Sequence, residues 1–263
     1  ESLDHIQAVM VASSLRFLPL VDEDGCVVGV HANDFVPAKP THRPNPVVLM
    51  VGGMGTRLRP LTDDTPKPLL RIGGKPILEI IIDSFVNQGF VNFHLAVNYK
   101  AEMIKQHFGD GRAHGANITY IEEKERMGTC GALSLLPEPP KETFLVMNGD
   151  LLTTVDFGAL IDFHHRHRSM ATMAVREYDY QVPFGVIKNE GHHICGIDEK
   201  PIQRFFVNAG IYALSPAVLE YIIPDKYMDI TDLFNILIKD GRNPCAFPIN
   251  EYWLDVGRMD DLE

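Results

Sequence analysis

The spacing of apolar positions changes along the 263-residue chain. From Val47 to Asp150, short apolar runs typical of buried strands alternate with segments of helical periodicity such as PILEIIIDSFVNQG and AEMIKQHFG. This alternation predicts parallel strand pairing with right-handed crossovers and helices on both faces. After residue 170 the pattern is richer in strands, with helices only near 215–223 and 229–240. We therefore expect an α/β fold with a mixed, mostly parallel sheet.

The first residues follow a different order. Residues 1–36 read as a helix over residues 6–15, then two strands joined by a turn at Asp24-Gly25. The stretch VPAKPTHRPNP that follows has four prolines and no periodicity, which marks a boundary. The sequence thus predicts a small unit at 1–36, a linker at 37–46 and a large domain at 47–263.

Charge and cysteine usage narrow the choice of partners. A formal net charge of −11 argues against broad affinity for nucleic acid or anionic membranes. No apolar run approaches the ~20 residues that span a bilayer. The four separated cysteines indicate a reducing, cytoplasmic compartment without disulfides. Because the chain starts without Met and stops at Glu263, we expect it to be part of a longer protein.

One loop departs from the acidic average. The segment VGGMGTRLRPLTDDTPKP follows the strand that starts at Val47, and residues 52–75 contain five basic residues against two aspartates. Glycines let backbone N–H groups approach a phosphate or base closely, although a tight turn or a dinucleotide-binding loop would also use them. The Walker pattern fails, because no Gly-Lys-Ser/Thr closes the loop. Arg57 and Lys67 could clamp a triphosphate from two sides.

The same loop carries a family resemblance. GGMGTRLRPLTDDTPKP closely resembles the signature GGxGTRLxPLTxxxPKP of the sugar nucleotidyltransferases. That resemblance implies a Rossmann-like nucleotide-diphospho-sugar transferase fold, and a reaction of an NTP with a sugar 1-phosphate that releases pyrophosphate and uses Mg²⁺. It places the nucleotide against Gly52, Gly53, Gly55 and Thr56. We expect Arg57 to hold the leaving pyrophosphate and Lys67 the triphosphate.

Two downstream aspartates fit a metal site. Asp150 follows the apolar strand FLVM, where a carboxylate can hold a hard cation, although it could equally be a turn residue or helix cap. Asp255 lies in Trp253-Leu254-Asp255-Val256-Gly257. The resemblance implies that Asp150 and Asp255 bind Mg²⁺. The attacking sugar phosphate is already anionic, so no general base is expected, and positioning with charge neutralisation provides catalysis.

Further motifs match the substrate-binding parts of the family. The segment GTCGA, starting at Gly128, resembles a helix start that packs against nucleoside and sugar. Glu199 and Lys200 match an E-K-P motif whose lysine meets the sugar phosphate, Asn208 matches an asparagine that contacts sugar hydroxyls, and Gly185 matches a loop that closes over the sugar. Taken by itself, a lysine beside a proline at a strand end is usually just solvated.

The base and the sugar are harder to read. Guanine presents adjacent N–H donors that a carboxylate could accept, which makes Glu122 or Glu123 a candidate for the base contact. We take Glu122 as the contact and GTP as the nucleotide. UTP, dTTP or CTP are the alternative nucleotides. His164, His165 and His167 could suggest a metal cluster, but surface positions on a helix are the simpler expectation.

In the first unit, FLPLVDEDGCVVGV resembles the second half of a single CBS motif, so residues 1–36 are expected to be a partial CBS motif, of a kind that functions in pairs. A full pair would bind an adenine nucleotide, and packing or homo-oligomer formation is the alternative role. Nucleotidyltransferases with such a pair include enzymes acting on glucosamine 1-phosphate with GTP, towards surface-polysaccharide or legionaminic-type sugars. Competing hypotheses are a regulatory homologue that binds nucleotide sugar without turnover, and a ligand sensor built on the first unit.

Overall fold

A computed structural model describes Met10 and residues 17–22, 26–32 and 42–257. The chain divides into two compact units, Glu1–Pro40 and Thr41–Glu263. Within the described residues, no helix is both long and apolar enough to cross a membrane.

The described part of the first unit is a β-hairpin. Strands β1 (Phe17–Val21) and β2 (Val27–Ala32) pair antiparallel, with Phe17 opposite Ala32. The Asp22 carboxylate accepts a hydrogen bond from the Cys26 backbone N–H at 2.9 Å, which holds the two strand ends together. The predicted turn at Asp24-Gly25 and most of the predicted helix over residues 6–15 lie outside the described residues, so the CBS resemblance stays a prediction.

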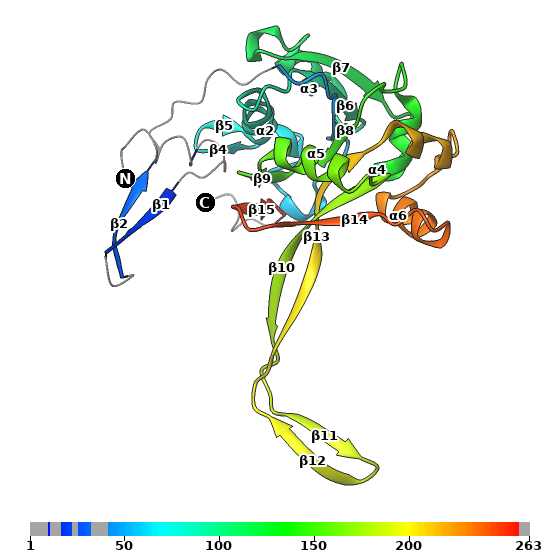
Figure 1. The fold of residues 1–263 in the computed structure, drawn as a ribbon. Helices are drawn as coiled ribbons and strands as arrows, with labels where there is room; N and C mark the ends of the chain where they lie inside the picture. The colour runs from blue at the N-terminus through cyan, green and yellow to red at the C-terminus, as the bar shows by residue number, and fades with distance from the viewer. Residues whose placement is uncertain (1–9, 11–16, 23–25, 33–41, 258–263) are drawn as a thin grey trace. The chain divides into compact units, whose positions relative to one another are not determined.

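The second unit is built on a seven-stranded sheet with the order β14-β10-β13-β8-β3-β6-β7 (Figure 1). Only β13 runs antiparallel to its two neighbours among the strands of this sheet in the described chain. This confirms the mixed, mostly parallel α/β sheet. The strands are β3 (Val47–Met50), β6 (Asn92–Val97), β7 (Asn117–Glu122), β8 (Phe144–Asn148), β10 (Ala171–Gln181), β13 (Ile202–Leu214) and β14 (Cys245–Ile249).

Helices cover both faces of this sheet because its central strands are apolar on both sides. In β3, Val47 and Leu49 join one buried cluster while Val48 joins the other. The first cluster contains side chains of α2 (Ile77–Val86), α3 (Ala101–Phe108) and α5 (Phe157–Arg166). The second contains side chains of α4 (Gly128–Gly131), the 3₁₀ helices η4 (Ala132–Leu135) and η5 (Pro216–Tyr221), and α6 (Ile230–Lys239). Two separate cores therefore fix the sheet from either side.

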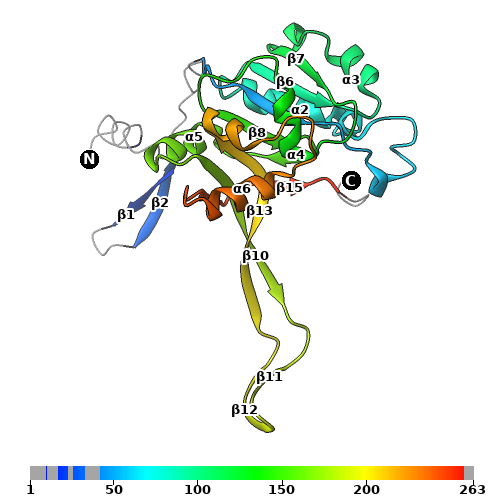
Figure 2. The same ribbon diagram turned by 90° about the vertical axis from the view of Figure 1, so that its right-hand side faces the viewer.

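Two of the sheet strands continue beyond the sheet as a two-stranded arm. β10 and β13 stay paired from Arg176 with Val207 to Gln181 with Ile202, and both views show this ribbon leaving the body (Figures 1 and 2). At its end lie β11 (Val186–Glu190) and β12 (His193–Asp198), a second antiparallel pair. We call residues 176–207 the arm.

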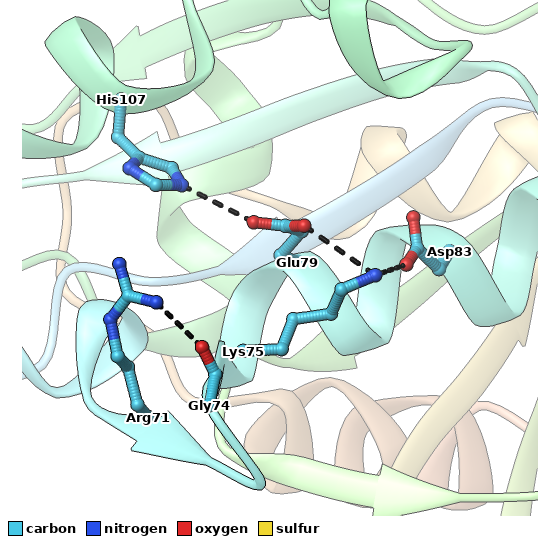
Figure 3. A network of polar contacts seen from close by, with 6 residues as sticks. All are labelled: Arg71, Gly74, Lys75, Glu79, Asp83 and His107. Atoms are coloured by element: carbon cyan, nitrogen blue, oxygen red, sulfur yellow. Dashed lines mark hydrogen bonds and ion pairs between the residues drawn. The ribbon is translucent and has the colours of Figure 1, made fainter.

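Two small strand pairs flank the central sheet. β9 (Leu151–Thr153) pairs antiparallel with β15 (Trp253–Asp255). β4 (Arg71–Ile72) and β5 (Lys75–Pro76) form a tight hairpin that leads into α2. Figure 3 shows how polar contacts tie this hairpin to the helices: Lys75 pairs with Glu79 at 3.5 Å and Asp83 at 2.5 Å, and Glu79 also contacts His107 of α3 at 3.4 Å.

Candidate active site

The glycine-rich loop begins where β3 ends, at the carboxyl edge of the parallel strands. The backbone N–H of Val51 still pairs with Ala96 of β6 at 2.9 Å, and the chain then turns at Gly52. A Cβ on Gly52 would lie 3.0 Å from the Asn98 Cβ and 3.3 Å from a carboxylate oxygen of Glu123. The missing side chain therefore keeps an opening between this backbone and the end of the neighbouring strand, where a flat ligand could rest.

Gly55 closes the loop in a conformation that needs glycine. Its φ is +61°, and a Cβ there would lie 2.8 Å from the Thr62 side chain. The Thr62 hydroxyl donates to the Gly55 carbonyl at 2.9 Å. The 3₁₀ helix η1 (Thr56–Leu58) follows at once, anchored by the buried Leu58. Thr56 and Arg57 thereby stand on a short, fixed turn and remain exposed.

A nearly buried lysine faces the loop from the second short helix. Lys67 starts η2 (Lys67–Leu69), and its Nζ pairs with the Asp150 carboxylate at 2.5 Å. The exposed fraction of the side chain is 11% for Lys67 and 29% for Asp150. Lysine is rarely buried to this extent without a charged partner, so this ion pair is the local reason that Lys67 can lie here.

Asp150 is placed by a close approach of two backbones. It follows β8 through Gly149, whose N–H donates to the Met50 carbonyl at 2.9 Å. A Cβ on Gly149 would lie 2.8 Å from that carbonyl oxygen and 2.4 Å from the Val51 side chain. Only glycine fits this contact, and it sets Asp150 beside the glycine-rich loop.

Asp255 reaches the same place through the β9–β15 pairing. Asp255 lies opposite Leu151 in that ladder, and the next N–H along the chain, that of Val256, donates to the Asp150 carbonyl at 3.0 Å. The two aspartates, separated by more than a hundred residues in sequence, are therefore on neighbouring backbones.

Arg57 completes this group. A Cβ on Gly257 would lie 3.3 Å from a guanidinium nitrogen of Arg57 and 3.7 Å from a carboxylate oxygen of Asp255. Arg57, Lys67, Asp150 and Asp255 are thus brought together at one edge of the sheet. Two carboxylates are the usual protein share of a Mg²⁺ site, with phosphates and water as the other ligands. Throughout the described ranges, no group of three or more His, Cys, Asp or Glu side chains is arranged for a metal.

The opposite wall joins α4 to the start of α6. Gly128 has a φ of +75°, and a Cβ there would lie 2.5 Å from the Met228 carbonyl oxygen. That carbonyl accepts the N–H groups of Cys130 and Gly131, and the Thr129 hydroxyl accepts the N–H of Ile230 at 2.9 Å. Between this wall and the glycine-rich loop lies a cleft of about 320 Å³. Its volume suits a nucleotide-sized ligand.

The two candidate glutamates lie on opposite faces, because successive side chains alternate between the two faces of a strand. Glu122 ends β7 on the face of α3, exposed and paired with Lys105 at 2.5 Å, and it does not line the cleft. Glu123 shares the other face with Ile121, lines the cleft and accepts the Met127 N–H at 3.1 Å. Burial raises the pKa of the Glu123 carboxyl above its ordinary value. Of the two candidate glutamates, Glu123 therefore lines the cleft and Glu122 does not.

Two asparagines lie on the neighbouring strands β8 and β13. Asn148 lines the cleft, and its side-chain oxygen is buried without a hydrogen-bond partner in the described structure. Asn208 is held by two contacts: its carboxamide pairs with the Tyr212 hydroxyl at 2.8 Å and accepts the Gly210 N–H at 2.9 Å. A Cβ on Gly210 would lie 2.9 Å from the Asn148 amide nitrogen. Sequence reasoning named Asn208 and missed Asn148, which the unsatisfied acceptor reveals.

The remaining predicted residues lie on the arm. A Cβ on Gly185 would lie 2.9 Å from a carboxylate oxygen of Glu199, so these two positions are neighbours. Lys200 is exposed, with a φ of +46° at the corner between β12 and β13. From Asn208 to Ile202 the strand continues for six residues, about 20 Å at the usual rise. The structure therefore does not bring Gly185, Glu199 and Lys200 to the cleft of their own chain.

One histidine differs from the prediction. His164 is only 1% exposed, and its two ring nitrogens contact the Thr172 and Ser215 hydroxyls at 2.9 Å each. The prediction of a surface position was therefore wrong for His164, because α5 turns this residue towards β10. His165 and His167 are exposed, as predicted.

Burial raises the pKa of the Cys130 thiol to about 12, so this cysteine is a packing residue.

Fold and site together define a class of protein. A glycine-rich loop at the carboxyl edge of a mostly parallel sheet, beside a lysine, an arginine and two aspartates on neighbouring backbones, is suited to binding a nucleoside triphosphate. A family model described as nucleotidyl transferase matches residues 46–263, and the chain belongs to this family.

Relatives and solved structures agree with that assignment. The chain is 34% identical over 225 residues to a mannose-1-phosphate guanyltransferase of Saccharomyces cerevisiae and 34% identical over 224 residues to one of Candida albicans. In both cases the match covers 82% of this chain but only 62% of the relative. The crystal structure of HddC from Yersinia pseudotuberculosis complexed with GMP-PN superposes with a TM-score of 0.65 at 27% identity, over 83% of this chain and 96% of that one.

Proposed function

We propose that this protein transfers a nucleoside monophosphate from an NTP, with GTP as the best substrate, to a sugar 1-phosphate, and releases pyrophosphate. The observation that carries the proposal is the group of Arg57, Lys67, Asp150 and Asp255 beside the glycine-rich loop. Matched relatives are named as guanyltransferases of a sugar 1-phosphate, which supports the same reaction. The chain spans 62% of their length, so the comparison supports the domain's chemistry rather than the whole protein's.

The reaction needs little proton transfer. An oxygen of the sugar phosphate, already anionic at neutral pH, forms a bond to the α-phosphorus, and the bond from that phosphorus to the bridging oxygen breaks. Pyrophosphate leaves with the electron pair. Catalysis then depends on holding the two substrates in line and neutralising charge on the oxygens. We assign Arg57 to the departing pyrophosphate and Lys67 to the triphosphate.

Asp150 and Asp255 are the residues that would hold a divalent cation, with Mg²⁺ as the proposed ion. Their carboxylates are on neighbouring backbones, and hard oxygen ligands of this kind suit Mg²⁺. When bound, the ion would neutralise charge on the phosphates. In the described structure the Lys67 ammonium already balances the Asp150 charge.

We assign base selection to Glu123. One carboxylate oxygen accepts the Met127 N–H and the other lies 3.3 Å from the point above Gly52 where a side chain would begin. A carboxylate can accept both N–H donors on the edge of guanine, whereas uracil or thymine would need a donor as well. A neighbouring solved structure in complex with GMP-PN is consistent with a guanine nucleotide.

A matrix of substrates tests this proposal. Four NTPs are combined with mannose, glucose and glucosamine 1-phosphates in the presence of Mg²⁺, and pyrophosphate release is measured for wild type and Glu123→Gln. We expect the highest kcat/KM with GTP, and a loss of about 10- to 100-fold in preference for GTP over UTP in the variant. No pyrophosphate with any pair would overturn the proposed reaction. An unchanged GTP preference in Glu123→Gln would overturn only the assignment of the base contact.

A further inference from the structure

One cation that lines the cleft has no part in the proposed transfer. Arg126 lies on the loop between β7 and α4, and its exposed side chain lines the cleft together with Glu123. Within the described residues, Arg126 makes no ion pair and no side-chain hydrogen bond. An arginine with five N–H donors and no partner of its own can give all of them to a ligand.

The loop folds so that Arg126 lies next to the Glu123 carboxylate. The Met127 N–H donates to that carboxylate at 3.1 Å, and the same peptide unit carries the carbonyl group of Arg126. Burial raises the pKa of the Glu123 carboxyl, and the nearby charge of Arg126 opposes this rise. An acceptor and a donor thus stand side by side, and the carboxylate lies 3.3 Å from the point above Gly52 where a side chain would begin.

The other charged groups of the cleft already have partners. Asp229 accepts the Tyr227 hydroxyl at 2.8 Å and caps the start of α6. Arg57 and Lys67 belong to the group with the two metal-binding candidates, where Lys67 pairs with Asp150. Arg126 is therefore needed neither to neutralise Asp229 nor to complete the phosphate-binding group.

Guanine matches a carboxylate and a guanidinium placed side by side. Its N1–H and 2-amino group are donors for Glu123, and its O6 and N7 atoms are two adjacent acceptors that suit the arginine fork. Adenine has an amino donor in place of O6, which a guanidinium repels. Uracil and thymine can donate one N–H to Glu123 but offer a single acceptor, O4, beside it. A residue that reads O6 and N7 therefore disfavours all the other bases of this set.

We propose that Arg126 is a specificity-determining residue, whose guanidinium donates to O6 and N7 of guanine while Glu123 accepts from N1–H and the 2-amino group. This inference rests on the proposed nucleotidyl transfer and deepens it, because it concerns the choice of nucleotide. Arg126 acts on the base and not on the phosphorus that reacts.

The surroundings leave the side chain room to reach a base. Arg126 and Tyr227 line both the cleft and a second cavity of about 400 Å³. With open space on either side, the guanidinium can turn towards the base without displacing packed side chains. Lys124, two residues earlier, lines the second cavity but not the cleft, so it is a matched control.

Two nucleotides that differ at one ring position test the contact. Isothermal titration calorimetry measures the Kd of GTP and of 7-deaza-GTP, which has carbon in place of N7, with Mg²⁺ and without a sugar phosphate. We expect the wild type to bind GTP about 10-fold more tightly, because 7-deaza-GTP loses one hydrogen bond to a charged donor. Arg126→Met should bind the two nucleotides equally, and Lys124→Met should keep the wild-type preference.

The possible failures are distinguishable. Equal binding of the two nucleotides by the wild type would overturn the role of Arg126. So would an unchanged preference in Arg126→Met, even with weaker binding of both, because that result indicates only a general attraction for the triphosphate. Absence of pyrophosphate release from the wild type with every substrate pair would instead overturn the proposed function.

Inosine triphosphate separates Arg126 from Glu123. ITP keeps O6, N7 and N1–H but lacks the 2-amino group assigned to Glu123. Arg126→Met should therefore keep the preference for GTP over ITP, whereas Glu123→Gln should reduce it and keep the preference for GTP over 7-deaza-GTP. Loss of both preferences in Arg126→Met would mean that Arg126 only positions Glu123, and would overturn its direct contact with the base.

Discussion

The cleft and the arm show two ways in which one sheet presents functional residues. At the cleft, Lys67, Asp150 and Gly149 are fixed by an ion pair and by backbone hydrogen bonds of 3.0 Å or less. Along the arm, residues such as Phe205 and Lys200 are exposed. The comparison teaches that the groups at the cleft are positioned by contacts within the chain, whereas side chains of the arm are left largely exposed.

The sharpest test of the cleft is Asp150→Asn. Loss of the carboxylate charge removes one cation ligand and the partner of Lys67, so we expect kcat for pyrophosphate release to fall by on the order of 100- to 1,000-fold. Steady-state kinetics at saturating Mg²⁺ measure this change. The control is Asp162→Asn, an exposed aspartate on α5, which should leave kcat unchanged. Wild-type turnover in Asp150→Asn would remove Asp150 from the site.

The contribution of side-chain packing to stability should also differ strongly between the body and the arm. Phe85 is fully buried and stacks on Phe157 with ring centroids 3.8 Å apart, so Phe85→Ala should lower the free energy of unfolding by about 4 kcal/mol. Phe206 is 66% exposed, and Phe206→Ala should change it by less than about 0.5 kcal/mol. Urea unfolding measures both values. Comparable losses in the two variants would mean that the arm is packed as tightly as the body.

A pair of glycines sharpens the description of the cleft wall. Gly128 and Gly73 both have positive φ, but a Cβ would lie 2.5 Å from the Met228 carbonyl oxygen at Gly128 and meets nothing within 4 Å at Gly73. We expect Gly128→Ala to cost about 3 kcal/mol of unfolding free energy and Gly73→Ala about 1 kcal/mol. Thermal unfolding, analysed at a common temperature, separates them. Equal losses of unfolding free energy in the two variants would show that the backbone around α4 shifts easily to accommodate a side chain.

The smallest expected effect is the loss of stability at acidic pH. Burial lowers the pKa of His164 to about 4, whereas the unfolded chain binds that proton near the ordinary value of 6.5. The contribution of His164 to stability is therefore complete above the unfolded pKa and falls as the pH drops towards the folded one, by about 2 kcal/mol between about pH 8 and pH 5. Urea unfolding at several pH values measures the slope. His164→Asn should flatten it, and His165→Gln, at an exposed position, should not.

Much of this molecule could be predicted from its sequence, for local reasons. The helices at α2, α3 and α6 and the strands β3, β6, β7 and β8 follow directly from apolar periodicity. The glycine-rich loop, Asp150 and Gly128 were predicted because each lies in a short sequence motif that indicates the local backbone conformation. Alternation could also have separated Glu122 from Glu123, since Ile121 marks the face that Glu123 shares.

The rest depended on long-range geometry. No local pattern shows that β15 pairs with β9, so the closeness of Asp150 and Asp255 came only from the family resemblance. The burial of His164 depends on hydroxyls at Thr172 and Ser215, which lie on other elements. The strands of the arm were predicted, but their departure from the sheet was not, because alternation within a strand does not reveal where its neighbours end.

The β9–β15 pairing has a consequence for the synthesis of this chain. Asp150 emerges from the ribosome long before Asp255, and the second carboxylate joins the first only when β15 adds to β9. A nascent chain that stops before Trp253 can form the glycine-rich loop, the cleft wall and the Lys67–Asp150 ion pair, but it holds a single carboxylate. Translation therefore delivers the proposed phosphate-binding scaffold first, and its second carboxylate only near the end of the domain.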